Sequence, residues 1–182
     1  MKASCKVYIA SSLDGFIAKP DGDVDWLDHP SYTLEGEGFG YTEFMDSISA
    51  LIMGRNTYEK VLTFGEWHYS KPVFVITSQD LNIPDELTDK VFLIKGSPSE
   101  IVSELANKGF SSLYIDGGKT IQSFLKEGLI SEMTITQIPV LLGDGIPLFA
   151  LLEEEIHLKL RSSISFANGF ILSTYEVINK TS

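Results

Sequence analysis

The chain has 182 residues, of which 43% are apolar and 21% charged, enough for one folded domain with its own core. We therefore expect residues 1–182 to form a single domain. No run of about 18 apolar residues occurs, which argues against a membrane span. Twenty-five acids against 14 bases give a net charge of −11, and no basic cluster stands out, so nucleic acid is not expected as a partner.

Cys5 is the only cysteine. The chain cannot form an internal disulfide, and this cysteine usage predicts a reducing, cytoplasmic location.

The first half of the chain alternates apolar strands with breaker-rich or helical segments. Residues 6–10 predict a strand, and residues 11–30 contain too many glycines and prolines for a helix, so a long loop is expected. Residues 41–50 favour a short helix. The stretch "ALIMGRNTYEKVL" then predicts a strand, Gly54 and a helix that begins near Thr57.

The second half repeats this order. Residues 71–79 and 91–95 predict buried strands, and Ser97, Pro98 and Glu100 form the capping-box signature of a helix that should stop at Gly109. The stretch "LYIDGGKTIQSFL" predicts a strand, two glycines and a helix.

Residues 132–142 alternate in the manner of a strand. Asn168-Gly169 predicts a hairpin with a type I′ turn. Together the elements predict an α/β fold: helices on both faces of a mixed, mainly parallel sheet, closed by a C-terminal antiparallel hairpin.

Three junctions end predicted strands and offer ligand-binding groups: Gly54–Thr57, Thr77–Ser78 and Gly117–Thr120. Ligands bind at the carboxyl ends of parallel strands, and the free N–H groups of a helix N-terminus attract phosphate. Each junction alone is explained equally well by a tight, capped turn. Because three such junctions occur in series, and one of them contains Arg55, we favour a ligand site.

Other chemistries find little support. The glycine-rich dinucleotide and P-loop motifs are absent. His29, His68 and His157 are scattered, and one cysteine cannot build a thiolate cage, so we expect no metal site. The acidic run "DGDVDWLDHP" is expected to be a solvated loop. Asp14 is expected to fix its own loop by backbone hydrogen bonds.

Four motifs, "YIASSLDGFIA", "LIMGRNTYE", "VFVITSQ" and "LYIDGGKTIQSFL", resemble the dihydrofolate-reductase-like superfamily in order and spacing. The closest branch is the reductase domain of bacterial riboflavin biosynthesis enzymes. The resemblance implies that the fold is a three-layer, dihydrofolate-reductase-like α/β/α sandwich. It also implies that the chain is an NADPH-dependent oxidoreductase that reduces a pterin- or pyrimidine-like small molecule, as a 5-amino-6-(5-phosphoribosylamino)uracil reductase does.

The same resemblance assigns cofactor-binding roles by position. The residues it implies are Ala10, Ile17 and Trp26 at the nicotinamide, Gly54, Arg55, Thr57, Thr77 and Ser78 at the adenosine end, and Gly117, Gly118, Lys119 and Thr120 at the pyrophosphate. It also implies a homodimer, and the apolar stretch 139–149 either serves such an interface or packs under a loop.

Asp116 precedes the double glycine, where the riboflavin branch carries a substrate-side carboxylate, so Asp116 is the candidate catalytic residue. The alternative is that it only caps the turn. Dihydrofolate reductases carry an acid shortly after the tryptophan, whereas Ser31 or Tyr32 stands there in this chain. Three alternatives stay open: a dihydrofolate reductase with a relocated acid, an NADPH-binding module without catalysis, and a soluble α/β domain with well-capped turns and no cofactor.

Overall fold

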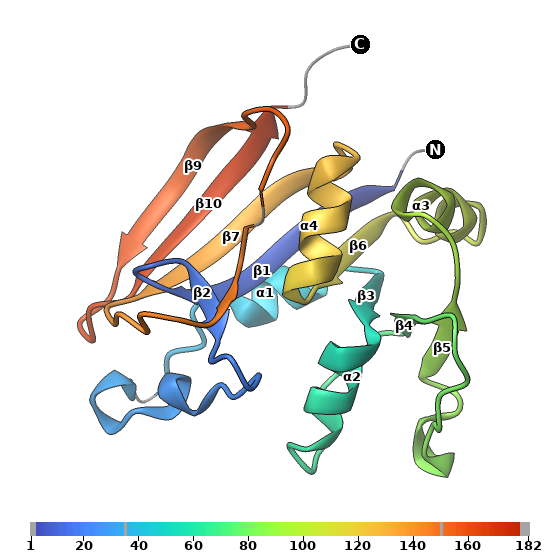
Figure 1. Ribbon diagram of the computed structural model, residues 1–182, viewed down its shortest axis with the longest axis horizontal. Helices are drawn as coiled ribbons and strands as arrows, with labels where there is room; N and C mark the ends of the chain where they lie inside the picture. Colours follow the sequence, from blue (N-terminus) through green and yellow to red (C-terminus); the bar gives the residue numbers. More distant parts are fainter. Residues whose placement is uncertain (1–2, 35, 150, 179–182) are drawn as a thin grey trace.

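The computed structural model describes residues 3–34, 36–149 and 151–178, and strands and helices alternate through most of them (Figure 1). The strands are β1 (Ser4–Ser12), β2 (Phe16–Ala18), β3 (Ala50–Gly54), β4 (Val73–Ile76), β5 (Val91–Ile94), β6 (Ser112–Asp116), β7 (Ile130–Ile138), β8 (Ile146–Pro147), β9 (His157–Ser165) and β10 (Ile171–Ile178). The helices are α1 (Tyr41–Asp46), α2 (Arg55–Leu62), α3 (Pro98–Asn107) and α4 (Gly118–Lys126). Short 3-10 helices occupy Asp25–Asp28, Pro30–Tyr32 and Asp85–Leu87.

Eight of these strands form one sheet in the order β5-β4-β3-β6-β1-β7-β10-β9. The strands from β5 to β7 run parallel to one another, β10 is antiparallel to β7, and β9 is antiparallel to β10. The remaining strands, β2 and β8, pair with each other. The predicted mixed, mainly parallel sheet with a C-terminal hairpin is confirmed.

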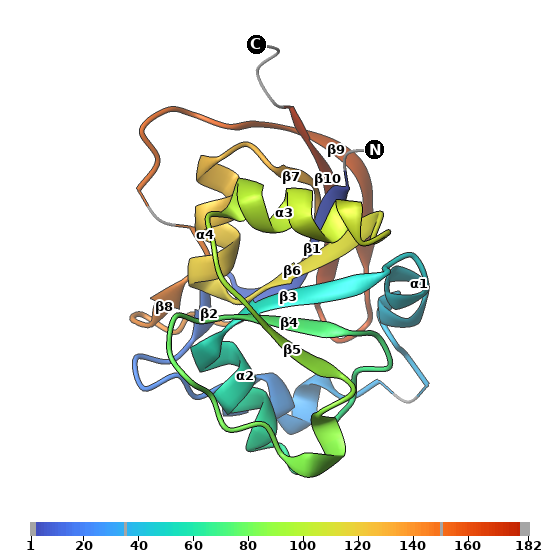
Figure 2. The same cartoon turned by 90° about the vertical axis from the view of Figure 1, so that its right-hand side faces the viewer.

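Helices cover both faces of the sheet, and Figure 2 shows α3 and α4 on one side and α2 on the other. One core cluster packs α3 and α4 against the sheet through residues such as Leu105 and Phe124. A second cluster contains Phe44 of α1 and Tyr58 of α2. The two clusters make the structure a three-layer arrangement, as predicted.

Helix α3 has the start and end that its sequence predicts. The Ser97 hydroxyl accepts the Glu100 backbone N–H at 3.4 Å, and the Glu100 carboxylate accepts the Ser97 N–H at 2.8 Å. The helix ends at Asn107, and Gly109 follows with a φ of +93°. This reciprocal cap fixes the residue at which α3 begins after β5.

The expectation of an unstructured loop over residues 11–30 was too simple. Residues Phe16–Ala18 form β2, and single 3-10 turns begin at Asp25 and Pro30. Glycine and proline exclude a long helix but permit single turns and short edge strands. The helix expected over 41–50 ends at Asp46.

The hairpin over Asn168-Gly169 is present, but the predicted turn type is wrong. Phe166 and Phe170 pair through a 2.9 Å hydrogen bond from N–H to carbonyl, which leaves three residues in the loop. Gly169 has a φ of +87°, whereas Phe39 is the only described non-glycine residue with a positive φ, so Asn168 cannot form a type I′ turn. A three-residue loop with glycine in the left-handed position gives the hairpin instead.

No helix within the described ranges has the length and apolar character needed to cross a membrane.

Candidate functional site

The predicted junctions lie side by side at the carboxyl ends of the parallel strands because these strands are in register. Gly54 at the end of β3 pairs with Ile76 of β4, and Ile76 pairs with Ile94 of β5. On the other side of β3, Met53 pairs with Asp116 of β6. Residues distant in sequence therefore end adjacent strands side by side, which is where open α/β sheets bind ligands.

A hollow of about 420 Å³ opens at this edge beyond β3, β4 and β5. Its lining residues are Arg55, Ile76, Thr77, Ser78, Gln79, Lys95 and Gly96. Three residues predicted for the adenosine end of a cofactor, Arg55, Thr77 and Ser78, thus share one hollow.

Arg55 is held in place by neighbours on both sides. Its Nε donates to the Glu59 carboxylate at 2.6 Å, one helical turn along α2, and its Nη1 donates to the side-chain oxygen of Gln79. The side chain remains 40% exposed. The guanidinium is therefore fixed at the mouth of the hollow yet open to an anion from solvent.

The turn after β4 is built by Thr77. Its hydroxyl accepts the Gln79 N–H at 3.1 Å and donates to the Gln79 carbonyl at 3.2 Å, and its side chain is buried. Ser78 is exposed beside it. Thr77 shapes the turn, and Ser78 is the hydroxyl that a ligand can reach.

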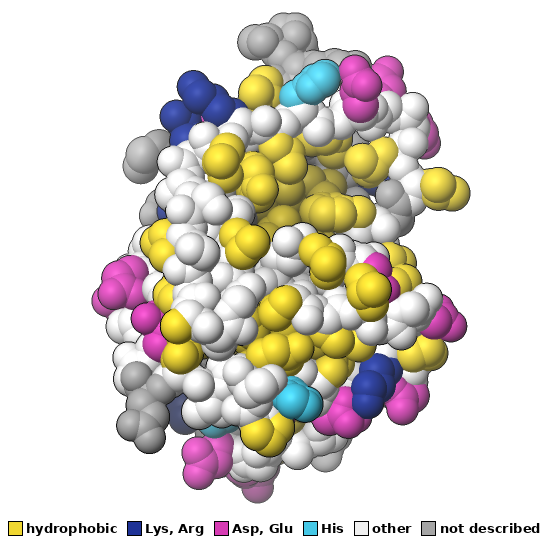
Figure 3. Space-filling model, turned by 90° about the vertical axis from the view of Figure 1, so that its left-hand side faces the viewer, with side chains coloured by type: hydrophobic (Ala, Val, Ile, Leu, Met, Phe, Trp, Pro, Cys, Tyr) yellow, Lys and Arg dark blue, Asp and Glu magenta, His cyan; other side chains and the backbone are white. Residues whose placement is uncertain are grey.

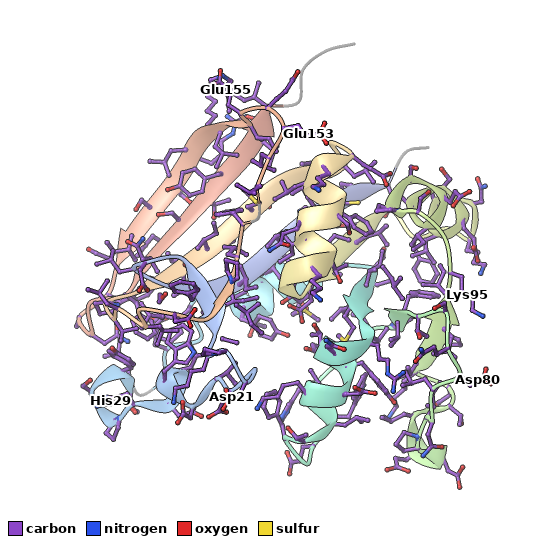
Figure 4. The ribbon with its side chains drawn as sticks, viewed as in Figure 1. Asp21, His29, Asp80, Lys95, Glu153 and Glu155 are labelled. Atoms are coloured by element: carbon purple, nitrogen blue, oxygen red, sulfur yellow. The ribbon has the colours of Figure 1, made fainter. Side chains whose placement is uncertain are left out.

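Gln79, Lys95 and Gly96 also line the hollow and were missed from the sequence. Figure 4 shows Lys95 beside β5, on the same side of the molecule as Asp80. The signal was present, since "VFLIKG" has the same strand–glycine pattern as the other junctions. The capping box at Ser97 already explains this junction as the start of a helix, so the sequence gives no separate reason to expect a ligand there.

The Gly54 and Gly117 junctions interlock through their threonines. A Cβ on Gly117 would lie 2.2 Å from the Thr57 hydroxyl oxygen, and a Cβ on Gly54 would lie 3.1 Å from the Thr120 hydroxyl oxygen. Each glycine thus makes room for the threonine of the other junction, and Gly117 also has a φ of +89°. The pairing joins the N-terminal ends of α2 and α4 at the sheet edge.

Gly118 is covered by β2 and β8. A Cβ there would lie 2.8 Å from Cδ1 of Ile17 and 3.5 Å from the Pro147 carbonyl oxygen. Ile17 therefore lies at the α4 N-terminus, beside the predicted pyrophosphate turn. Lys119 is exposed in the first turn of this helix, which has no side-chain cap.

Asp116 is the last residue of β6 and directly precedes the Gly117 junction. It is partly buried, and its Oδ1 accepts the Gly117 N–H at 2.8 Å. Loss of solvent raises its pKa to about 6, and this effect outweighs the hydrogen bond from the Gly117 N–H, which lowers it. Asp116 therefore caps the turn and also has a raised pKa.

Ala10 and Trp26 lie in a third hydrophobic cluster with Ile138 and Phe170. Trp26 is only 8% exposed, and its Nε1 has no hydrogen-bond partner among the described residues. Tyr32, one of the two residues that stand where dihydrofolate reductases are expected to carry an acid, packs against Phe170 with a centroid distance of 5.2 Å. Neither Ser31 nor Tyr32 has a carboxyl group.

Asp14 has the structural role expected of it. Its carboxylate accepts the backbone N–H groups of Gly143 at 2.8 Å and Leu142 at 3.2 Å, and the Ser12 hydroxyl at 2.6 Å. These bonds lower the pKa of Asp14 and tie the loop after β1 to the loop after β7. Asp21 and His29 belong to the loop region near β2 (Figure 4).

Comparison with known proteins gives one consistent result. A family model described as the RibD C-terminal domain matches residues 5–172. The uncharacterized protein YwjB of Bacillus subtilis is 40% identical over 174 residues, which cover 93% of this chain and 95% of that protein.

Solved structures agree. The crystal structure of a putative riboflavin biosynthesis protein from Shewanella sp. PV-4 superposes with a TM-score of 0.91 at 44% identity, covering 97% of this chain and 99% of that one. The dihydrofolate reductase of Enterococcus faecalis, complexed with NADP(H), superposes with a TM-score of 0.67 at 16% identity, covering 98% of this chain and 99% of that one. The fold is therefore dihydrofolate-reductase-like.

Proposed function

Because the chain belongs to the RibD C-terminal domain family, we propose that it is an NADPH-dependent reductase that transfers a hydride to a pterin- or pyrimidine-like small molecule. One observation carries the proposal. A hollow lined by the cationic Arg55 and Lys95 opens at the carboxyl ends of the strands, where Asp116 also lies. The pKa of Asp116 is raised to about 6. A cationic subsite beside an unusually basic carboxyl group is typical of a site that binds an anionic cofactor and moves a proton.

The residues at the carboxyl ends of these strands would hold NADPH in three parts. Arg55 and Lys95 would hold the 2′-phosphate, with Ser78 as an additional donor. The free N–H groups at the start of α4, with Lys119 and Thr120, would receive the pyrophosphate. Ala10, Ile17 and Trp26 would enclose the nicotinamide. When bound, NADPH supplies the hydride.

Asp116 would act on the substrate side of that hydride transfer. At neutral pH a carboxyl group with a pKa of about 6 is mostly ionised yet gains a proton far more easily than an ordinary aspartate. It can accept a hydrogen bond from a ring N–H group, and it can pass a proton to a ring nitrogen. The Gly117 N–H holds the carboxylate in one orientation for both tasks.

The two arginines of the chain provide a matched test of the cofactor proposal. Arg55 lines the hollow, whereas Arg161 pairs with Glu176 on β9 and β10. We expect the wild type to bind NADPH at least tenfold more tightly than NADH, read from quenching of tryptophan fluorescence. Arg55→Ala should weaken NADPH binding about 10–100-fold and leave NADH binding nearly unchanged, since a charge-assisted contact contributes about 1.5–3 kcal/mol.

Arg161→Ala should bind both nucleotides as the wild type does. Equal affinity of the wild type for both nucleotides, or an equal loss of NADPH affinity in both variants, would refute the assigned 2′-phosphate subsite. If neither nucleotide binds, the reductase proposal itself is refuted.

We also propose that the enzyme is a homodimer that works in the cytoplasm. Figure 3 shows hydrophobic side chains gathered on the side of the molecule that Figure 1 shows at its left, with charged side chains mainly near the margin. Leu158 and Leu160 of β9 pair with Val177 and Tyr175 of β10, and both leucines are at least 40% exposed. An exposed apolar edge strand is a site for pairing with another chain. Because Cys5 is the only cysteine, the chain forms no internal disulfide, as is usual for proteins of a reducing compartment.

A further inference from the structure

The turn between β9 and β10 lies against the part of the chain that carries Trp26 (Figure 1). We call residues 26–34 the Trp26 segment and residues 166–170 the hairpin tip. Phe170 of the tip belongs to the same buried cluster as Trp26, and Ala10 of β1 packs against this cluster. The hairpin tip and two of the residues expected at the nicotinamide therefore share one small core.

Two phenylalanine rings of the hairpin tip pack against neighbouring aromatic rings. The Phe170 ring lies 5.2 Å from the Tyr32 ring and 5.3 Å from the Phe39 ring, centroid to centroid. The Phe166 ring packs edge-on against the Phe39 ring at 4.9 Å. Phe39 is itself tied to the sheet, because the Tyr8 hydroxyl of β1 donates to its carbonyl at 2.7 Å. The tip thus lies between the Trp26 segment and a fixed point beside β1.

The Asn168 side chain joins the hairpin tip to the Trp26 segment by hydrogen bonds. Its Nδ2 donates to the Tyr32 carbonyl at 2.7 Å, and its Oδ1 accepts the Phe170 N–H at 3.1 Å. In the part of the chain that the structure describes, every other hydrogen bond of the Trp26 segment stays within residues 24–37. One side chain therefore fixes the turn and also links this segment to a distant strand pair.

The Trp26 segment has a polar anchor near each end. Asp25, directly before it, pairs with Lys19 at 2.5 Å, and Asn168 holds Tyr32 near the other end. The Trp26 side chain between these anchors is buried, and its Nε1 has no hydrogen-bond partner in the described residues. Because apolar packing is not directional, the indole takes its position from the backbone that the two anchors hold.

We infer that Asn168 is a positioning residue for the nicotinamide end of the cofactor site. The inference rests on the proposed function, in which Ala10 and Trp26 enclose the nicotinamide. Asn168 acts through Tyr32 and the hairpin tip, which it fixes before the cofactor binds, so that binding does not have to order this segment. The adenosine end is independent of Asn168, because β6, β1 and β7 separate β3, which leads to Arg55, from β10 in the sheet.

Two ligands distinguish the two ends of the site: NADPH, and adenosine 2′,5′-bisphosphate, which has the 2′-phosphate but no nicotinamide. Asn168→Asp keeps an oxygen for the Phe170 N–H and removes the donor to the Tyr32 carbonyl. In calorimetric titrations this variant should bind NADPH about three- to tenfold more weakly than the wild type does, the usual contribution of one neutral hydrogen bond. It should bind the bisphosphate as tightly as the wild type does, whereas a general disturbance of the fold would weaken both ligands alike.

Ser131→Ala is the matched control. The Ser131 hydroxyl, near the start of β7, donates to the Cys5 carbonyl of β1 at 2.9 Å. This variant also loses one side-chain hydrogen bond between distant segments, but at the amino end of the strands. It should bind NADPH and the bisphosphate as the wild type does.

A second measurement needs no ligand. In a Trp67→Phe background, Trp26 is the one remaining tryptophan of the chain, and the replaced Nε1 had no hydrogen-bond partner among the described residues. Acrylamide quenching of the fluorescence then reports the exposure of Trp26 alone. Asn168→Asp should raise the quenching constant, and Ser131→Ala should not.

NADPH affinity that is unchanged in Asn168→Asp, or an equal loss for both ligands, overturns the inference. The same NADPH-specific loss in Ser131→Ala overturns it too, as does a Trp26 that is no more accessible to acrylamide in Asn168→Asp. The proposed function survives each of these results as long as the wild type binds NADPH. A wild type that binds neither ligand refutes the proposed function, and the quenching result alone then decides whether Asn168 holds Trp26 in place.

Discussion

At Asp116, the structure holds a carboxyl group where solvent is scarce and no described cation offsets the loss. Its pKa is raised from 3.8 to about 6, with burial as the largest cause. The folded chain therefore takes up this proton more readily than the unfolded chain does. The contribution of Asp116 to the free energy of unfolding is therefore largest below about pH 4, falls as the pH rises from 4 to 6, and stays at the lower value above pH 6.

Asp116→Asn removes this ionisation but keeps an oxygen for the Gly117 N–H. We expect the variant to be more stable than the wild type at pH 7, by about 1–2 kcal/mol after allowance for partial solvation, and no more stable at pH 4. Urea unfolding at both pH values measures the difference. A variant less stable than the wild type at pH 7 would show that the ionised carboxylate stabilises the fold, contrary to the direction derived above.

Sequence patterns could not predict the site residues that lie on loops. Arg55 directly follows β3 and Asp116 ends β6, so their position at the carboxyl ends of the strands follows from strand–helix alternation. Gln79 lies in the loop after β4, and Lys95 and Gly96 lie between β5 and α3. Their convergence with Arg55 on one hollow depends on how β3, β4 and β5 pack together, which no local pattern encodes.

At the scale of elements, the interlocked junctions explain why α2 and α4 begin where they do. Gly117 combines a φ of +89° and a ψ of 137° with the Thr57 hydroxyl in the space of its missing Cβ. The existence of each strand–glycine–helix junction was predictable from sequence. Their mutual packing was not, because it requires β3 and β6 to be neighbours although about 60 residues separate them in the chain.

Gly117→Ala should therefore lower the free energy of unfolding by more than backbone strain alone would. We expect a loss of about 3 kcal/mol or more in the free energy of unfolding, because a strained backbone (about 1–3 kcal/mol) and overpacking against Thr57 (about 1–3 kcal/mol) add together. Gly109→Ala is the matched control, since Gly109 has a φ of +93° with nothing within 4 Å of its missing Cβ. That variant should lose only about 1–2 kcal/mol. Equal losses in chemical denaturation would remove the packing role from Gly117.

At the scale of the whole molecule, the two sheet edges differ. Every residue of β9 is exposed, including Leu158, Leu160 and Ile164. β5, at the opposite edge, is half as long and buries Val91 and Ile94. The hairpin that forms the β9 edge was predictable from its sequence, but the uncovered apolar face was not, because exposure depends on which helices reach the sheet.

Leu160→Glu should convert the proposed dimer into monomers, since it places a charge at the centre of the apolar pairing surface. Light scattering after size-exclusion chromatography gives the mass directly. Leu93→Glu on β5, also at an exposed leucine of an edge strand, should leave the mass unchanged. A wild-type protein that is monomeric at micromolar concentration contradicts the homodimer proposal, as does a dimer that persists in Leu160→Glu.

The central claim is that NADPH lies across the carboxyl ends of β3, β4, β5 and β6. Hydrogen–deuterium exchange with and without saturating NADPH tests it most directly, because bound cofactor slows exchange of the amides it covers. The account predicts slower exchange at residues 54–57, 77–79, 95–96 and 117–120, and unchanged exchange in the β9–β10 hairpin. Slower exchange confined to the hairpin, or no change at the four junctions under saturating NADPH, would contradict it.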